Sequence, residues 1–252
     1  MKKVTLLKRL VELGLATDAA IAEKLVETGQ ILVNGVPRTS PRSHVSSADC
    51  IALKEKSGYV SRAALKLLAG LDHFSISVKG KVCADLGSST GGFVQVLLER
   101  GALLVYAIDT ATNELDWSLR SHERVVPMDR TNACFVEKLP KRAEFVTADI
   151  SLVPATEFLP AIKRILGEQG EAVILVKPQY QLEKKYVPAG GVVQDERLWR
   201  LALEVVIERA TEISLFPHGV VRSPVQGRSG NQEFLLLLRC LPPEHAFVLP
   251  PP

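Results

Sequence analysis

From residue 81 onward, short apolar runs alternate with segments of helical periodicity. Strands are expected at 82–86, 103–108, 125–128, 145–150 and 172–176, and helices at 91–100, 157–166 and 195–211. Such alternation is typical of a mainly parallel sheet with helices on both faces. The last two apolar runs, 213–221 and 233–240, leave no room for a helix between them, so they should pair as an antiparallel hairpin at one edge. The pattern predicts an α/β fold.

The first 56 residues follow a different pattern. Amphipathic helices are expected at 6–15 and 17–28, with Asp18 as an N-cap and Gly29 as a stop. Asn34 and Gly35 between apolar neighbours predict a two-residue hairpin turn, and 50–53 predicts a further short strand. We therefore expect a small α+β domain at 1–56, a linker at 57–60, an α/β domain at 61–241 and a disordered Pro-rich tail at 242–252.

The chain's positive charge is concentrated at its start. Residues 1–56 contain nine Lys and Arg against six Asp and Glu, and the remainder is balanced, so the net charge of +3 belongs to this segment. Clustered cations are consistent with a polyanion partner, because they neutralise phosphates, and equally with a solvated basic surface.

Several classes of protein are disfavoured by the composition. The four cysteines are widely spaced and form no CxxC pair, so neither disulfides nor a metal site is expected. No signal peptide and no apolar stretch of membrane-spanning length is recognisable, which predicts a cytoplasmic protein with no membrane partner.

A glycine-rich turn follows the first strand of the α/β part and opens the next helix. It reads Asp85, Leu86, Gly87, Ser88, Ser89, Thr90, Gly91, Gly92 and Phe93. Its spacing differs from the GxGxxG of nicotinamide proteins, and it lacks the Lys of a phosphate-binding P-loop. Such a turn is either structural or a place where the backbone approaches a ligand.

Acids at the ends of neighbouring strands favour the ligand interpretation. Asp109 ends the second strand, where a carboxylate can accept hydrogen bonds from ribose hydroxyls. S-adenosylmethionine fits better than NAD, with Asp85 near the methionine ammonium, Asp109 at the ribose and Asp129 at the adenine amino group. Asp129 is equally well explained as a turn-forming acid after a strand.

Four further residues are candidates for catalysis. Lys66 lies on a helical run, Asp149 and Lys177 end apolar strands, and Glu233 opens one. Methylating a ribose 2′-hydroxyl requires a base or a cation that favours the alkoxide, and a lysine whose charged form is disfavoured can serve. Asp149 could orient Lys177 while also facing the cofactor. A surface lysine and an edge-strand acid are the structural alternatives for Lys177 and Glu233.

Competing methyl-transfer chemistries lack their motifs. Methylases of exocyclic amines need an Asn or Asp-Pro-Pro-aromatic loop after the fourth strand, where this chain has Asp149, Ile150, Ser151 and Leu152. Carbon-5 methylation of pyrimidines needs a nucleophilic cysteine, and none ends the fourth or fifth strand.

Together these segments resemble the TlyA (hemolysin A) family of ribosomal RNA 2′-O-methyltransferases, whose catalytic half is similar to FtsJ-type enzymes. The likeness runs from about residue 6 to 239. Its most specific pieces are Tyr59-Val60-Ser61-Arg62, the 81–93 segment, Leu115-Asp116-Trp117, Arg130-Thr131-Asn132, Val176-Lys177-Pro178-Gln179 and Gly230-Asn231-Gln232-Glu233.

The resemblance implies a fold, an activity and partners. It implies a Rossmann-like S-adenosylmethionine-dependent methyltransferase domain, whose seven-stranded, mainly parallel sheet carries an antiparallel edge hairpin, preceded by an RNA-binding domain of the alpha-L type. The implied substrate is cytidine ribose in ribosomal RNA or ribosomal subunits, with Lys66, Asp149, Lys177 and Glu233 as the catalytic tetrad. Candidate RNA contacts are Lys8, Arg9, Lys24, Asn34, Arg38, Arg42 and Arg62.

Two other functions remain open at this point. A ribosome-assembly factor could use the same fold to bind RNA without turnover, and it would not need the sulfonium cofactor. A membrane-active hemolysin is the third hypothesis, which the family name invites and which the lack of a long basic amphipathic helix disfavours.

Overall fold

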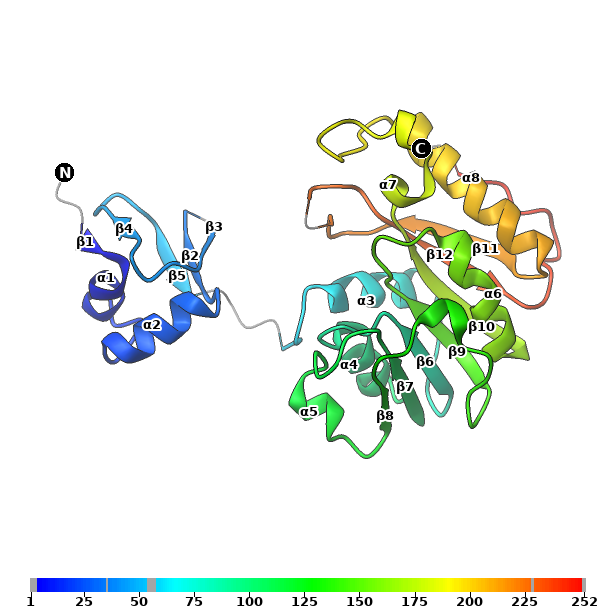
Figure 1. Cartoon of the computed structure of the whole chain (residues 1–252), viewed down its shortest axis with the longest axis horizontal. Coiled ribbons are helices and arrows are strands. Elements are labelled where there is room, and N and C mark those ends of the chain that lie inside the picture. Colours follow the sequence, from blue (N-terminus) through cyan, green and yellow to red (C-terminus); the bar gives the residue numbers. More distant parts are fainter. Residues whose placement is uncertain (1–3, 35, 54–57, 228, 251–252) are drawn as a thin grey trace. The chain divides into compact units, whose positions relative to one another are not determined.

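The computed structural model describes residues 4–34, 36–53, 58–227 and 229–250. The chain divides into two compact units, Met1–Ser57 and Gly58–Pro252, which Figure 1 colours from blue to cyan and from cyan to red. Gly35 of the expected turn, residues 54–56 at the end of the expected first domain and Ser57 of the expected linker lie outside the described residues.

The described residues of the first unit form two helices and two small sheets. Its elements are β1 (Val4–Thr5), α1 (Leu6–Glu12), α2 (Ala19–Glu27), β2 (Ile31–Val33), β3 (Val36–Arg38), β4 (His44–Val45) and β5 (Ile51–Leu53). Strand β1 pairs with β4, and the second sheet has the order β3-β2-β5 with antiparallel neighbours.

Local sequence explains these boundaries. The Asp18 carboxylate accepts a hydrogen bond from the Ile21 backbone N–H at 2.9 Å and caps α2, as expected. Val33 pairs with Val36, so the predicted two-residue hairpin is confirmed, and Asn34 has the positive φ of 52° that such a turn requires. Leu6, Leu10 and other apolar side chains of both helices and the sheet bury one another in a small core.

The second unit is built on a seven-stranded sheet with the order β11-β12-β10-β9-β6-β7-β8. Its strands are β6 (Val82–Leu86), β7 (Leu104–Ile108), β8 (Val125–Met128), β9 (Ala143–Ala148), β10 (Leu166–Val176), β11 (Phe216–Arg222) and β12 (Phe234–Arg239). Strands β8, β7, β6, β9 and β10 are parallel, and β12 pairs antiparallel with both β10 and β11. The predicted sheet and edge hairpin are confirmed.

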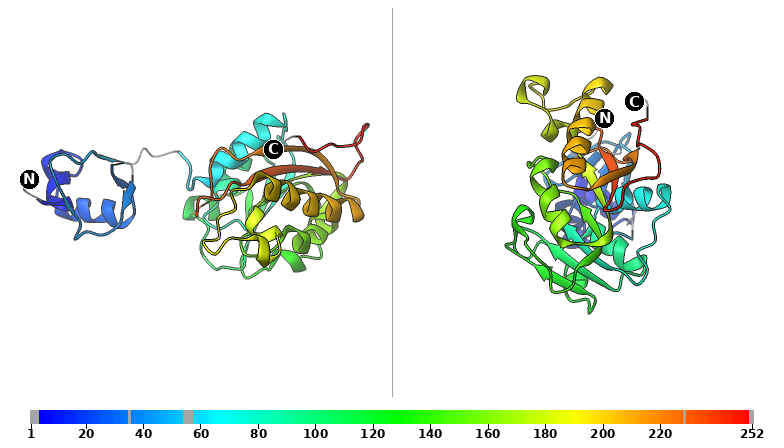
Figure 2. Two further views of the ribbon diagram at one scale, coloured as in Figure 1. Left: turned by 90° about the horizontal axis from the view of Figure 1, so that it is seen from above. Right: turned by 90° about the vertical axis from the view of Figure 1, so that its right-hand side faces the viewer.

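Helices cover both faces of this sheet. They are α3 (Ala63–His73), α4 (Gly92–Glu99), α5 (Trp117–Arg120), α6 (Ala155–Ile165), α7 (Pro178–Gln181) and α8 (Glu196–Glu212), with 3-10 turns η1 (Ala133–Phe135) and η2 (Lys184–Tyr186). Figures 1 and 2 show α3 and α4 on one side of the sheet and α6 and α8 on the other.

Alternation along the strands divides the core into two layers. In β6, Ala84 and Leu86 pack with α6 and α8, whereas Cys83 packs with α3 and α4. Successive strand side chains point to opposite faces, so a strand buried on both sides is apolar throughout. Asp85 interrupts this pattern as a carboxylate within a fully buried strand.

Element boundaries differ from the sequence-based expectation in places. Leu166 was expected to end a helix, but it begins β10, because it pairs with Ala143 before a register shift that precedes Glu171. Residues 242–250 contain neither helix nor strand, yet Leu249 packs against the core. Among the described residues, no helix is both long and apolar enough to cross a membrane.

Candidate functional site

The sheet topology brings the four catalytic candidates to one edge. Asp149 follows β9 and Lys177 follows β10, so both lie at the carboxyl ends of parallel neighbours. Glu233 precedes β12, and because β12 runs antiparallel to β10, its beginning lies beside the end of β10. Lys66 is delivered by α3, which packs on β12. The carboxyl edge of an open α/β sheet is where ligands bind.

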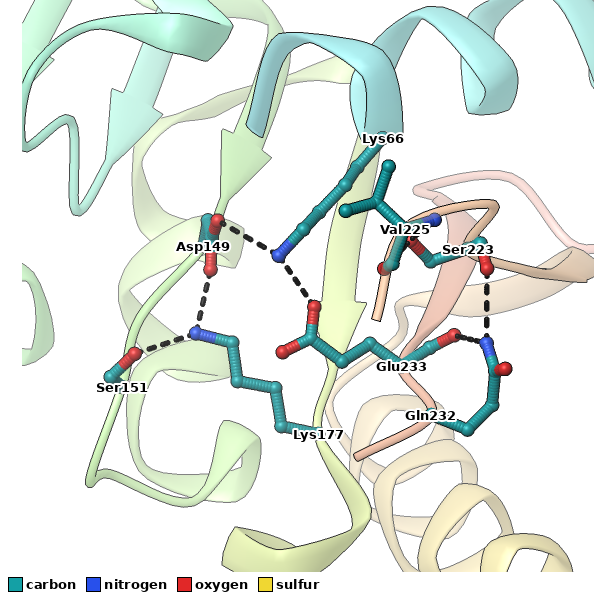
Figure 3. Close-up of polar contacts among 8 residues, drawn as sticks. All are labelled: Lys66, Asp149, Ser151, Lys177, Ser223, Val225, Gln232 and Glu233. Carbon is teal, nitrogen blue, oxygen red and sulfur yellow. Dashed lines mark hydrogen bonds and ion pairs between the residues drawn. The ribbon is translucent and has the colours of Figure 1, made fainter. Parts of the chain in front are cut away.

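The four side chains form a chain of alternating charge (Figure 3). Lys66 Nζ lies 2.5 Å from Glu233 Oε2 and 4.0 Å from Asp149 Oδ2. Lys177 Nζ lies 2.6 Å from Asp149 Oδ1. Each lysine therefore contacts a carboxylate, and Asp149 is shared by both.

The group is largely removed from water. Lys66, Lys177 and Glu233 are 9%, 5% and 3% exposed. Buried charges are tolerated only when they are paired and hydrogen-bonded. Removing one partner of a buried pair strongly destabilises the fold, because it leaves the other charge buried without a partner. The burial argues against the surface-lysine alternative for Lys177 and the edge-charge alternative for Glu233.

Glu233 is held by the loop that precedes it. Ser223 donates its backbone N–H to the Glu233 carbonyl at 2.8 Å, and the Gln232 side-chain amide donates to the carbonyls of Ser223 and Glu233. Figure 3 shows this amide between the two segments. A methyl group on Gly227 would come within 2.5 Å of Glu233 Oε1, so only glycine leaves room for the carboxylate.

The glycine-rich turn fits tightly against its surroundings. Gly87 has a φ of 81°, and a Cβ there would lie 2.9 Å from the Asp149 carbonyl oxygen. Gly91 has a φ of 99°, and its Cβ would overlap the side chains of Leu119 and Leu115. Both positions therefore require glycine for a left-handed conformation and for a close approach.

Asp85 is the best-buried carboxylate of the site. It is 1% exposed, and its Oδ1 accepts a hydrogen bond from Thr147 Oγ1 at 2.7 Å. Oδ2 is buried and has no hydrogen-bond partner in the described structure. Burial raises the pKa of Asp85 to about 7, although the Thr147 hydroxyl opposes the shift. A buried, unpaired carboxylate oxygen next to the glycine-rich turn fits the ammonium group of a methionine-type cofactor.

The other two acids proposed for the cofactor have different surroundings. Asp109 accepts hydrogen bonds from the backbone N–H groups of Ser89, at 2.8 Å, and Ala111, at 2.9 Å, which ties the second strand to the glycine-rich turn. Asp129 forms a two-pronged pair with Arg120, at 3.0 and 2.8 Å. Hydrogen bonding to Arg120 lowers the pKa of Asp129. Asp129 therefore already has a structural partner.

A cavity of about 130 Å³ lies at this edge of the sheet. It is lined by Gly87, Ile108, Asp109, Thr110, Thr131, Asn132, Ala133, Cys134, Ile150, Ser151 and Val153. Of the residues expected at the cofactor, Gly87 and Asp109 belong to its wall. Phe93 is instead buried in the core, and Gly92 packs against the start of α3.

A second, polar hollow of about 690 Å³ adjoins the tetrad. Its lining residues are Arg62, Ser223, Pro224, Val225, Gln226, Gly227, Gly230 and Gln232. Arg62 is exposed and precedes Lys66 by four residues, so the two side chains project from the same face of the helix start. The hollow thus joins a guanidinium to the loop that holds Glu233.

The remaining RNA-contact candidates lie in the first unit. Lys8, Lys24, Arg38 and Arg42 are exposed, and Arg9 pairs with Glu12 at 3.2 Å. The Asn34 amide donates to Asp49 Oδ1 and accepts from the Cys50 backbone N–H, so this side chain already supports its own turn. The contact of these residues with RNA stays a prediction.

Sequence reasoning missed several residues of the site. Ser151 accepts a hydrogen bond from Lys177 Nζ at 2.7 Å, and Thr131, Asn132 and Cys134 line the cavity. Ser151 lies in the segment that leaves the carboxyl end of β9, and the other three lie in the segment that leaves the carboxyl end of β8, which was the available signal. Within the described ranges, no group of three or more His, Cys, Asp or Glu side chains is placed to hold a metal ion.

Comparisons with known proteins agree with this architecture. Residues 59–240 match the model for FtsJ-like methyltransferases, and residues 4–51 match the S4 domain. The 16S/23S rRNA (cytidine-2′-O)-methyltransferase TlyA of Mycobacterium tuberculosis is 40% identical over 234 residues, which cover 91% of this chain and 87% of that protein.

Solved structures show the same fold. A Streptococcus thermophilus protein assigned as a hemolysin is 34% identical, with a TM-score of 0.74 over 95% of this chain and 89% of the other. An S-adenosylmethionine-dependent methyltransferase from Mesorhizobium loti shares only the fold, at 14% identity and a TM-score of 0.53 over 68% of this chain and 96% of the other. The chain belongs to the TlyA (hemolysin A) family of FtsJ-like methyltransferases, with an S4 domain at its start.

Proposed function

We propose that this protein transfers a methyl group from S-adenosylmethionine to a ribose 2′-hydroxyl of ribosomal RNA. The observation that carries the proposal is the pairing of the buried Lys177 with Asp149 at the cofactor edge of the sheet. The M. tuberculosis relative is named for this reaction on cytidine, and we extend both the reaction and the base to this chain. Ribosomal subunits are the proposed partners, and the cytoplasm is the proposed location.

The residues present fit the cofactor. Asp85 Oδ2 would take the ammonium group, Asp109 the ribose hydroxyls, and the backbone around Gly87 would lie against the ligand. When bound there, S-adenosylmethionine supplies an electrophilic methyl group on a sulfonium. The chain itself must then remove a proton from the 2′-hydroxyl.

Lys177 is the proposed proton acceptor. Its amine form would take the 2′-hydroxyl proton at Nζ, and the resulting ammonium would remain beside the Asp149 carboxylate. Lys66, held between Glu233 and Asp149, balances the charge of these two acids, and once Lys177 has taken the proton Asp149 faces a cation on each side. The burial of the group excludes water, which strengthens these interactions.

Replacing Lys177 tests the proposal. Lys177→Ala should abolish methyl transfer to ribosomal subunits while retaining S-adenosylmethionine binding, because the lysine lies beyond the cofactor cavity wall. Tritium transfer to rRNA and calorimetry of cofactor binding measure the two effects. Lys185→Ala, which removes an exposed lysine paired with Glu183, is the matched control and should remain active. Full activity of the Lys177 variant would contradict the assigned role.

A further inference from the structure

Ser151 is the second hydrogen-bond acceptor of the proposed catalytic lysine. Its Oγ lies 2.7 Å from Lys177 Nζ, which also lies 2.6 Å from Asp149 Oδ1, and Figure 3 shows the two contacts in different directions from the nitrogen. Ser151 is exposed, whereas Lys177 is 5% exposed, so the serine lies between the buried amine and the surface. It follows Asp149 by two residues on the loop that leaves β9.

The geometry of an amine gives this contact a consequence. A neutral lysine Nζ has two N–H donors and one lone pair in a tetrahedral arrangement. Asp149 and Ser151 accept the two N–H bonds, and the lone pair is left for the proton of an incoming hydroxyl. With Asp149 alone, rotation about the Cε–Nζ bond could place either N–H on Asp149, so the lone pair would alternate between two directions.

Ser151 also connects the lysine to the cofactor site. It contributes to the wall of the 130 Å³ cavity together with Gly87 and Asp109. The same residue therefore touches the amine and borders the space where the methyl donor is proposed to lie. Correct alignment of the two reacting groups accounts for a large part of catalysis, and small misplacements are costly.

We propose that Ser151 is a positioning residue that directs the lone pair of Lys177 toward the 2′-hydroxyl. This inference rests on the proposed function and adds a residue to it. Ser151 takes no proton itself: the proton passes from the 2′-oxygen to Lys177 Nζ, and the serine hydroxyl accepts an N–H bond throughout.

Removing the hydroxyl tests the proposal. Ser151→Ala should lower kcat about tenfold, the size expected for one hydrogen bond, with KM for ribosomal subunits and Kd for S-adenosylmethionine unchanged. Ser151→Thr keeps the hydroxyl and should restore kcat to within about twofold. Ser121→Ala is the matched control, since its Oγ donates to the Trp117 carbonyl and does not contact the tetrad.

Three results would overturn the role. One is a kcat for Ser151→Ala equal to that of the unmodified protein. Another is a rate loss that disappears at saturating cofactor, which would make Ser151 a binding residue of the cavity. The third is a threonine variant as slow as the alanine variant, which would mean that shape and not the hydroxyl matters.

A measurement without turnover separates this inference from the proposed function. In protein labelled with 15N at lysine Nζ, the Lys177 resonance, identified by its loss in Lys177→Ala, reports the hydrogen bonds of the amine. It should shift in Ser151→Ala and return toward its original position in Ser151→Thr. An unmodified protein that fails to methylate ribosomal RNA would refute the proposed function, whereas an unchanged Lys177 Nζ resonance in Ser151→Ala would refute the positioning role alone.

Discussion

Asp85 has surroundings that are unusual for a carboxylate. It lies inside a fully buried strand, and burial raises its pKa to about 7. One carboxylate oxygen accepts a hydrogen bond, and the other has no hydrogen-bond partner among the described residues. Burial of an unpaired carboxylate opposes folding because the charge loses its contact with water. Unfavourable burial of this kind is found mainly at functional sites. A cationic partner would relieve it, and the proposed cofactor carries one.

The pH dependence of folding should reveal this cost. The pKa of the Asp85 carboxyl group is 3.8 in the unfolded chain and about 7 in the folded one. The folded state therefore holds a proton more tightly, and its relative stability falls as the pH rises from about 4 to 7. Without cofactor, Asp85→Asn should be more stable than the unmodified protein at pH 8, by up to about 4 kcal/mol, and the difference should vanish toward pH 4.

Thermal unfolding of both proteins across this range provides the measurement. Asp72→Asn, which alters an exposed carboxylate paired with Arg100, is the control and should show no comparable trend. The same Asp85 variant should bind S-adenosylmethionine more weakly, since it loses the charge proposed to face the ammonium group. Equal stability of the two proteins at pH 8 would contradict the burial argument.

At the scale of elements, the placement of α3 against α4 decides where Lys66 lies. Gly92 is the first residue of α4, and a Cβ there would overlap Ser61 Oγ and lie 3.0 Å from the Ala64 backbone nitrogen. The two helix starts therefore meet at a glycine. Lys66 is one turn further along α3, so its reach to Glu233 depends on this contact.

A methyl group at this contact should separate the helices. Gly92→Ala should lower the stability of the second unit by about 1–3 kcal/mol, as overpacking does, and reduce methyl transfer through displacement of Lys66. Combining it with Ser61→Gly removes the nearest clash and should recover part of both losses. Gly190→Ala is the matched control, because a Cβ there meets nothing within 4 Å. Chemical denaturation and the rRNA assay measure the two effects. A Gly92 variant as stable as the control would show that α3 can move away from the added methyl group without a loss of stability.

At the scale of the whole molecule, the excess positive charge lies in one of the two units. The net charge of +3 comes from the first unit's segment, and the second unit has as many acids as bases. Residues 4–51, which match the S4 domain, contain five Lys and Arg and five Asp and Glu, so the excess cations of the first unit are Lys2, Lys3, Lys54 and Lys56, beside that match. Salt should therefore act mainly on RNA docking by the first unit as a whole, because releasing counterions from phosphates is the salt-sensitive part of binding.

Replacing two exposed cations of the first unit tests whether this unit makes the salt-sensitive contacts with RNA. The double variant Lys8→Ala with Arg42→Ala should bind ribosomal subunits more weakly, and the slope of log affinity against log salt should fall by about 0.7–0.9 for each phosphate that the variant no longer neutralises. Cofactor binding should be unaffected. Lys184→Ala with Lys185→Ala removes the same charge from the second unit and serves as the control; identical slopes for the two double variants would place the salt-sensitive contacts elsewhere.

The sequence predicted elements better than contacts. The Asp18 cap, the Asn34 turn and the final hairpin follow from residue types at fixed local offsets, and all were found where expected. Ser151 was not recognised as a partner of Lys177, because 26 residues separate the two and a serine after a strand has no distinctive local signal. Leu166 was assigned to a helix because its pairing with Ala143 is not visible in local periodicity.

By itself, the sequence determined the kind of fold and the position of each candidate at the end of an element, because backbone preference and side-chain alternation are local properties. Only the tertiary structure decided which of these residues meet. The strand order β12-β10-β9 brings Glu233, Lys177 and Asp149 to one edge, and α3 carries Lys66 to Glu233 across 167 positions of the chain. Contacts of this range depend on how the strands are ordered and on what burial requires of each charge, and neither is encoded in any single segment.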